Sequence, residues 1–189
     1  IDTSSLVAVL AASSLAVSLA LQSIMTNFAS GMIIVGNKPF KEGDYISVGD
    51  YSGTVTNITL HSTTLVTPDN KVVIIPNSDI SGGTVVNYSA MPERRLDLEF
   101  TVAYGTNVEK VKKVLTKVLE EHALVLHDKD YNVRLSAEDA SALRFICRCW
   151  VKNEDYWTVN FDLHENVVAA FKKANIEIPF NQLDVNIKK

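Results

Sequence analysis

The chain has 189 residues, of which 47% are hydrophobic and 21% charged, a composition that is ordinary for folded protein. Its formal net charge of -4 argues against the basic surface of a nucleic-acid-binding protein, so we expect no nucleic-acid partner. Because residue 1 is Ile rather than Met, we expect a piece of a longer protein, and the sequence leaves open how many membrane spans precede it.

The first element is an uncharged stretch. Residues 3–37 carry no charged side chain and lie between Asp2 and Lys38. Since about 20 apolar residues cross a bilayer as a helix, residues 1–37 are predicted to form a transmembrane helix with a kinked interfacial extension. A signal peptide is disfavoured, because no basic region precedes the run and the run is too long. Lys38 and Lys41 follow the run, which favours a cytoplasmic location for the rest of the chain.

One narrow face of this helix carries small or polar residues and two leucines. If several copies form a ring, this face lines a pore, and Leu15 and Leu19 form two stacked apolar collars that gate by dewetting. The other predicted pore-lining residues are Ser4, Ala8, Ala11, Gln22 and Thr26. Small residues on the flanks would let neighbouring helices approach closely; they are Ala12, Ser14, Ala16 and Ser18. This pattern alone does not distinguish a pore helix from an ordinary Ala/Leu/Ser membrane helix or from a buried helix of a soluble protein.

Two positions weaken the helix toward its end. Gly31 costs about 1 kcal/mol relative to Ala in a helix interior. Ser23 can bond to the preceding turn and bend the axis. We therefore predict hinges at Ser23 and Gly31, with a more polar segment, residues 24–35, lying nearer the membrane interface.

From Pro39 the pattern changes to short strands separated by turns. Strands are predicted at residues 45–48, 53–60, 63–67, 71–75 and 84–88. Strands this short and this closely turned are typical of a small β barrel, which we assign to residues 38–92.

Pro92 biases Met91 away from helix and marks a boundary. Beyond it, strands are predicted at 95–103, 131–135, 142–151 and 176–178, with amphipathic helices after the N-cap Asn107 and at 156–174. The order β-α-β-β-α-β is that of a ferredoxin-like α/β domain, assigned to residues 93–180. In the C-terminal segment, 181–189, residues 183–187 are predicted to form a strand without a local partner.

The sequence shows no catalytic set. The four histidines lie in different predicted elements, and no phosphate-binding or nucleophile motif occurs. Cys147 and Cys149 face the same side of a predicted strand, which suits neither a mutual disulfide nor, without further ligands, a metal site. Unpaired buried thiols fit a reducing compartment. We expect no enzyme activity, no cofactor and no metal.

Four stretches together carry a family resemblance. They read LAVSLALQSIMTNFASG, KPFKEGDYISVGDYSGTV, VVIIPNSDI and NYSAMPERR. In these motifs the chain resembles the small-conductance mechanosensitive channel (MscS) family, over nearly its whole length.

The resemblance implies a channel opened by membrane tension that releases ions and small solutes on hypo-osmotic shock. It implies a homoheptamer in the bacterial inner membrane, in contact with membrane lipids, with the C-terminal body in the cytoplasm. Residues 38–92 would be the family's Sm-like β domain, and 181–189 would supply a strand of a parallel barrel between subunits. Ser23 stands where the family has a kink glycine, and Gly31 matches a second hinge. The alternative is a membrane-anchored, ligand-binding regulatory module without a pore.

Overall fold

The structure is a computed structural model that describes residues 3–183 and residue 185. The chain forms two compact units, divided between Ala90 and Met91. The first unit contains a long helix and a β domain, and the second is an α/β domain.

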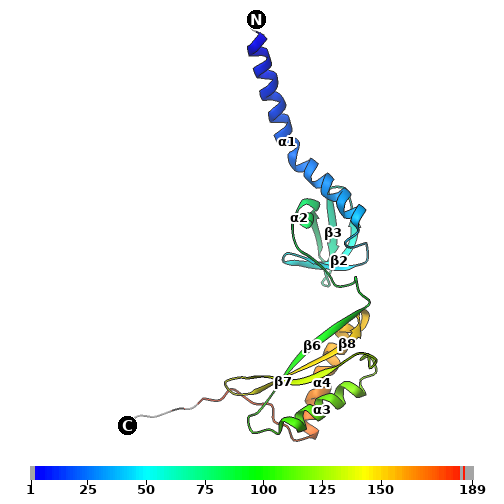
Figure 1. Ribbon diagram of the computed structural model, residues 1–189, viewed down its shortest axis with the longest axis vertical. Helices are drawn as coiled ribbons and strands as arrows, with labels where there is room; N and C mark the ends of the chain where they lie inside the picture. Colours follow the sequence, from blue (N-terminus) through cyan, green and yellow to red (C-terminus); the bar gives the residue numbers. More distant parts are fainter. Residues whose placement is uncertain (1–2, 184, 186–189) are drawn as a thin grey trace. The chain divides into compact units, whose positions relative to one another are not determined.

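The uncharged stretch forms one helix, α1 (Thr3–Asn37), whose axis changes direction partway along its length (Figure 1). At 1.5 Å per residue a helix of this length measures about 52 Å, which exceeds the roughly 30 Å hydrocarbon core of a bilayer. The helix ends at Asn37, and the next residue, Lys38, has a left-handed φ of 48° and a backbone N–H that donates to the Ile34 carbonyl at 2.9 Å.

The β domain is an antiparallel sheet in the order β4-β3-β2-β1-β5. Its strands are β1 (Tyr45–Val48), β2 (Tyr51–Ile58), β3 (Ser62–Val66), β4 (Val72–Pro76) and β5 (Val85–Asn87). All five strands were predicted, with small shifts at their ends. Apolar residues from the strands pack with three residues outside them, which are Ile34 of α1, Phe40 of the following turn and Ile80 of the short helix after β4. The end of α1 therefore belongs to the core of the β domain.

A short helix, α2 (Asn77–Gly82), follows β4 and contradicts the turn and coil that the sequence predicted there. Pro76 precedes it, and no side chain caps its first turn. Its stability comes from tertiary contacts instead, because Asn77 and Ile80 are buried. Local sequence signals could not indicate such a helix.

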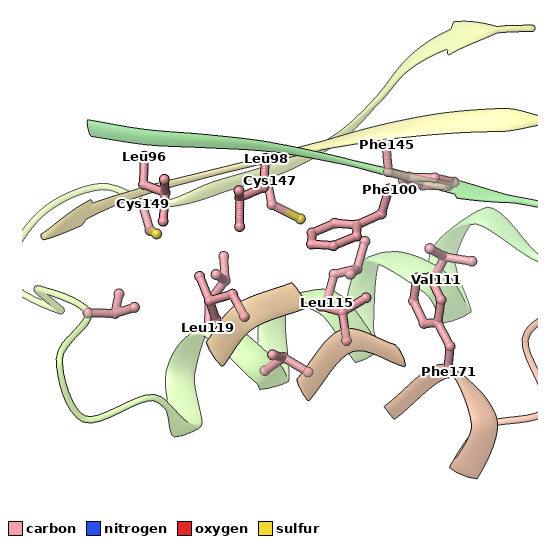
Figure 2. Packing of buried hydrophobic residues seen from close by; sticks show 14 of the residues in the cluster. Leu96, Leu98, Phe100, Val111, Leu115, Leu119, Phe145, Cys147, Cys149 and Phe171 are labelled. Atoms are coloured by element: carbon pink, nitrogen blue, oxygen red, sulfur yellow. The ribbon is translucent and has the colours of Figure 1, made fainter. Parts of the chain in front are cut away.

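The second unit is a two-layer α/β domain. Its elements are β6 (Glu93–Val102), α3 (Val108–Glu121), β7 (Asn132–Glu138), β8 (Leu143–Lys152), a 3-10 turn (Asn153–Asp155) and α4 (Tyr156–Lys173), and the sheet order is β6-β8-β7. Both helices pack on one face of the sheet, where alternate residues of β6 and β8 meet the apolar stripes of α3 and α4 (Figure 2). Asn107 caps α3 as predicted, because its side chain accepts from the Lys110 N–H at 3.0 Å.

Two predicted strands differ from the structure or lie beyond it. Residues 176–178 are not a strand; the Ala103 N–H donates to the Glu177 carbonyl at 3.0 Å, but no ladder forms. The sheet consequently has three strands in the part of the chain that is described. The predicted strand at 183–187 falls largely outside the described residues, which end with 183 and 185.

Candidate functional site: helix α1 and its contact with the β domain

Helix α1 carries every residue predicted to line, gate or pack a pore. Among the described residues it is the one helix, over Leu6–Asn37, that is long and apolar enough to cross a membrane, with a mean hydropathy of 1.9. Leu15 and Leu19 are 61% and 62% exposed, and Leu21 on the opposite face is 45% exposed. Exposure in a single chain therefore does not separate a pore face from a lipid face, and those assignments stay predictions.

Hydroxyl groups on α1 bond to the preceding turn of the same helix. The Ser18 hydroxyl donates to the Ser14 carbonyl and the Thr26 hydroxyl to the Gln22 carbonyl, both at 2.9 Å. In a hydrocarbon environment an unpaired donor is costly. These local bonds let the helix carry hydroxyls on its predicted pore and packing faces without leaving their protons unpaired.

The last third of α1 is docked on α2 by neutral polar groups. The Ser78 backbone N–H donates to the Asn27 side-chain oxygen at 2.9 Å. One turn further along α1, the Ser81 hydroxyl donates to the Ser30 hydroxyl at 2.7 Å. These two bonds fix both the position and the rotation of α1 relative to the β domain.

Gly31 lies where the backbone of α1 comes close to the turn between β2 and β3. A Cβ atom on Gly31 would lie 2.7 Å from Asn77 Nδ2 and 2.8 Å from the Leu60 carbonyl carbon, and closer still to the Leu60 oxygen. Real Cβ atoms essentially never approach other atoms so closely. The structure thus gives Gly31 a packing role within a continuous helix, whereas its predicted role as a hinge stays a prediction, as does that of Ser23.

Asn77 holds the other side of this contact in place. It is fully buried, its Nδ2 donates to the Thr59 carbonyl at 2.8 Å, and its Oδ1 accepts from the Thr63 hydroxyl at 2.9 Å. Its backbone N–H donates to the His61 carbonyl at 3.0 Å. Asn77 therefore ties both ends of the β2–β3 turn to the start of α2, and it sets the backbone against which Gly31 packs.

Sequence reasoning did not identify this docking face. Its α1 members are Asn27, Ser30, Gly31 and Ile34, at the spacing i, i+3, i+4 and i+7 of one helix face. The signal was present, because within the last third of α1 the polar residues Asn27 and Ser30 and the glycine Gly31 lie on this one face. From the sequence, Gly31 was interpreted as a hinge and not as a point of contact.

The two cysteines lie in the core of the α/β domain, on β8. Burial raises the pKa of Cys147 to about 12, and it raises the pKa of Cys149 to about 11. Both thiols are therefore protonated at neutral pH and act as small apolar side chains. Among the described residues no group of His, Cys, Asp and Glu has the arrangement of a metal site.

Two domain families match the chain. Residues 23–90 match the "Mechanosensitive ion channel, beta-domain", and residues 96–178 match the "Mechanosensitive ion channel MscS, C-terminal" domain. An "Uncharacterized MscS family protein" of Buchnera aphidicola subsp. Schizaphis graminum is 40% identical over 189 residues, which is 100% of this chain and 67% of that protein. The chain belongs to the MscS family.

A named channel and a solved structure are also similar to the chain over most of its length. The small-conductance mechanosensitive channel of Edwardsiella ictaluri is 43% identical over 176 residues, which cover 93% of this MscS-family chain and 62% of that channel. The crystal structure of Helicobacter pylori MscS in its closed state matches with a TM-score of 0.95 at 30% identity, covering 100% of this chain and 75% of that one. This chain therefore spans only part of the length of the channels that it resembles.

Proposed function

We propose that the chain is the pore helix and the C-terminal body of a mechanosensitive channel, which membrane tension opens to release ions and small solutes on hypo-osmotic shock. The observation that carries this proposal is the joining of an uncharged helix to the β domain within one compact unit. A plain anchor needs no such docking, whereas a channel needs its pore helix held by the rest of the subunit. Membership of the MscS family supports the same conclusion.

The proposed gate is formed by Leu15 and Leu19. They lie about 40° apart around the helix axis, on a face whose other members are small or polar. In a ring of helices they form two narrow apolar collars, and water confined there loses hydrogen bonds. Tension favours a wider ring, and the gate opens when the gain in membrane area outweighs closed-state packing and the cost of wetting these leucines.

Assembly follows from the same helix. The small flank residues Ala12, Ser14, Ala16 and Ser18 let adjacent helices approach closely, and Ser23 and Gly31 are the proposed hinges. By family resemblance we propose a homoheptamer in the bacterial inner membrane, with its C-terminal body in the cytoplasm. Membrane lipids surround it, and ions and small solutes pass through it.

The direct test is recording from a membrane patch under suction after reconstitution of the full chain in vesicles. Stepwise currents that appear at a reproducible suction support the proposal. A purified protein that is monomeric in the membrane, and silent up to rupture of the patch, would overturn it, because a pore lined by one helix per subunit requires several copies.

A further inference from the structure

A buried carboxylate holds the turn through which the chain leaves α1. Asp44 is 6% exposed, and its Oδ2 accepts from the Lys41 backbone N–H at 3.1 Å. The same oxygen accepts from Asn87 Nδ2 at 2.9 Å. Since a buried carboxylate is costly unless donors satisfy it, Asp44 depends on one partner in its own turn and on another that lies 43 residues further along the chain.

Asn87, the last residue of β5, uses its whole side-chain amide in this contact. Its Nδ2 also donates at 3.1 Å to the carbonyl of Pro39, which lies just beyond the end of α1. Its Oδ1 accepts from the Ser89 backbone N–H at 2.9 Å. Because an amide offers N–H donors on one atom and an acceptor on the other, one side of Asn87 binds the exit of α1 and the other side binds the residues after β5.

The residues that Asn87 binds after β5 begin the segment that leads to the second unit. This connecting segment, residues 88–92, lies between β5 and β6, and the boundary between the two units falls within it. Its start is fixed a second time, because the Tyr45 N–H donates to Ser89 Oγ at 2.9 Å and the Tyr88 N–H donates to the Tyr45 carbonyl at 3.0 Å. The exit of α1 and the start of the connecting segment therefore share one set of hydrogen bonds.

We propose that the Asp44–Asn87 pair couples the end of α1 to the connecting segment, so that a displacement of either one displaces the other. In the channel of the proposed function, on which this use of the pair rests, the pair carries a movement of α1 to the segment that leads to the α/β domain. The bonds that carry the coupling lie within one chain and within one compact unit. The competing explanation is that each side chain stabilises only its own turn, Asp44 through Lys41 and Asn87 through Ser89.

Asn87→Asp separates these explanations because it keeps both local bonds. A carboxylate at residue 87 still accepts from the Ser89 N–H, and the bond from the Lys41 N–H to Asp44 is untouched. The substitution removes the bonds that Nδ2 donates and places two carboxylates face to face. Combining it with Asp44→Asn exchanges donor and acceptor, and it restores one bond between an amide and a carboxylate. Asn57→Asp, at an exposed position on β2, is a control with the same change in charge.

The measurement is hydrogen exchange of single amides in the full chain in phospholipid bilayer discs, read by mass spectrometry with electron-transfer fragmentation. The Lys41 amide reports the end of α1, and the Ser89 amide reports the connecting segment. We expect both to exchange at least about tenfold faster in Asn87→Asp, because a hydrogen bond to a charged group is lost and a like charge replaces its donor. The double variant should bring both amides to within about threefold of the parent, the remainder being the lost bond to Pro39. Asn57→Asp should exchange as the parent does.

Faster exchange at only one of the two amides, or at neither, would overturn the proposal, as would a double variant no better protected than Asn87→Asp. The Asn77 amide, which donates to the His61 carbonyl at 3.0 Å, reports the rest of the β domain and should not change. An equal acceleration at Asn77 would also overturn the proposal, because the pair would then hold the whole domain together. Since hydrogen exchange needs no channel opening, this result and the suction recordings can fail independently.

Discussion

Replacing Gly31 by alanine tests whether the docking of α1 depends on a close backbone approach. Ordinary contact begins at 3.4 Å, whereas the new Cβ would lie 2.8 Å from the Leu60 carbonyl carbon and closer still to the Leu60 oxygen, so the helix and the turn have to separate by more than the difference between those two distances. Overpacking typically costs about 1–3 kcal/mol, and because two of the atoms met here are backbone atoms, which cannot turn away, we expect the upper part of that range, about 2–3 kcal/mol. The gain of alanine over glycine in a helix offsets about 1 kcal/mol. We therefore expect the docked state to lose about 1–2 kcal/mol.

The Ser78 amide reports this loss directly, because its N–H bonds to Asn27 across the contact. A loss of 1–2 kcal/mol corresponds to about a 5- to 30-fold faster hydrogen exchange at that amide. Gly36→Ala is the matched control: it lies in the same helix, and nothing lies within 4 Å of its added Cβ. Gly36→Ala should slow exchange slightly or leave it unchanged. Equal exchange at Ser78 in the two variants would refute the steric argument.

Four further predictions concern the proposed gate and the two cores. Leu19→Ser should open at lower tension than the parent in patch recordings, because a hydroxyl removes the cost of wetting, whereas Leu21→Ser on the opposite face should not ease opening. Asn77→Ala should lower the free energy of unfolding by about 1–3 kcal/mol in chemical denaturation, because it leaves buried groups unpaired. Maleimide should modify Cys147 and Cys149 at pH 8 at least about a hundredfold more slowly in the folded chain than in the denatured one. Because folding raises both thiol pKa values above 9.0, their contribution to stability is complete below pH 9 and is lost as the pH rises toward 11, which denaturation at several pH values measures.

The periodicity of apolar residues was sufficient to predict an element wherever that element has one buried face. The alternation of Leu96, Leu98 and Phe100 predicted β6, and the absence of charge predicted one helix over 3–37. Such patterns are local, because each strand or helix repeats its burial every two residues or every turn. The N-cap Asn107 was predictable for the same reason, because its hydrogen-bond partner lies only three residues away.

Features that depend on distant partners were not predictable in this way. Helix α2 is held by bonds from Asn77 to Thr59 and Thr63, which lie in the preceding turn and strand. Residues 176–178 have the alternation of a strand, but a strand also needs a ladder, and one bond to Ala103 does not make one. The proposed gate at Leu15 and Leu19 requires contacts between subunits, which local periodicity does not encode.

The hydrogen bonds that dock α1 on the β domain should be insensitive to the concentration of salt. The pairs Asn27–Ser78 and Ser30–Ser81 join amide and hydroxyl groups without a formal charge. Dissolved salt weakens attraction between exposed ions, whose range shrinks from about 30 Å at 0.01 M to about 3 Å at 1 M ionic strength. Neutral bonds at contact distance escape this screening. Under the proposed function, an osmotic shock changes the ionic strength around the protein, and salt screening would not weaken the junction between α1 and the β domain during that change.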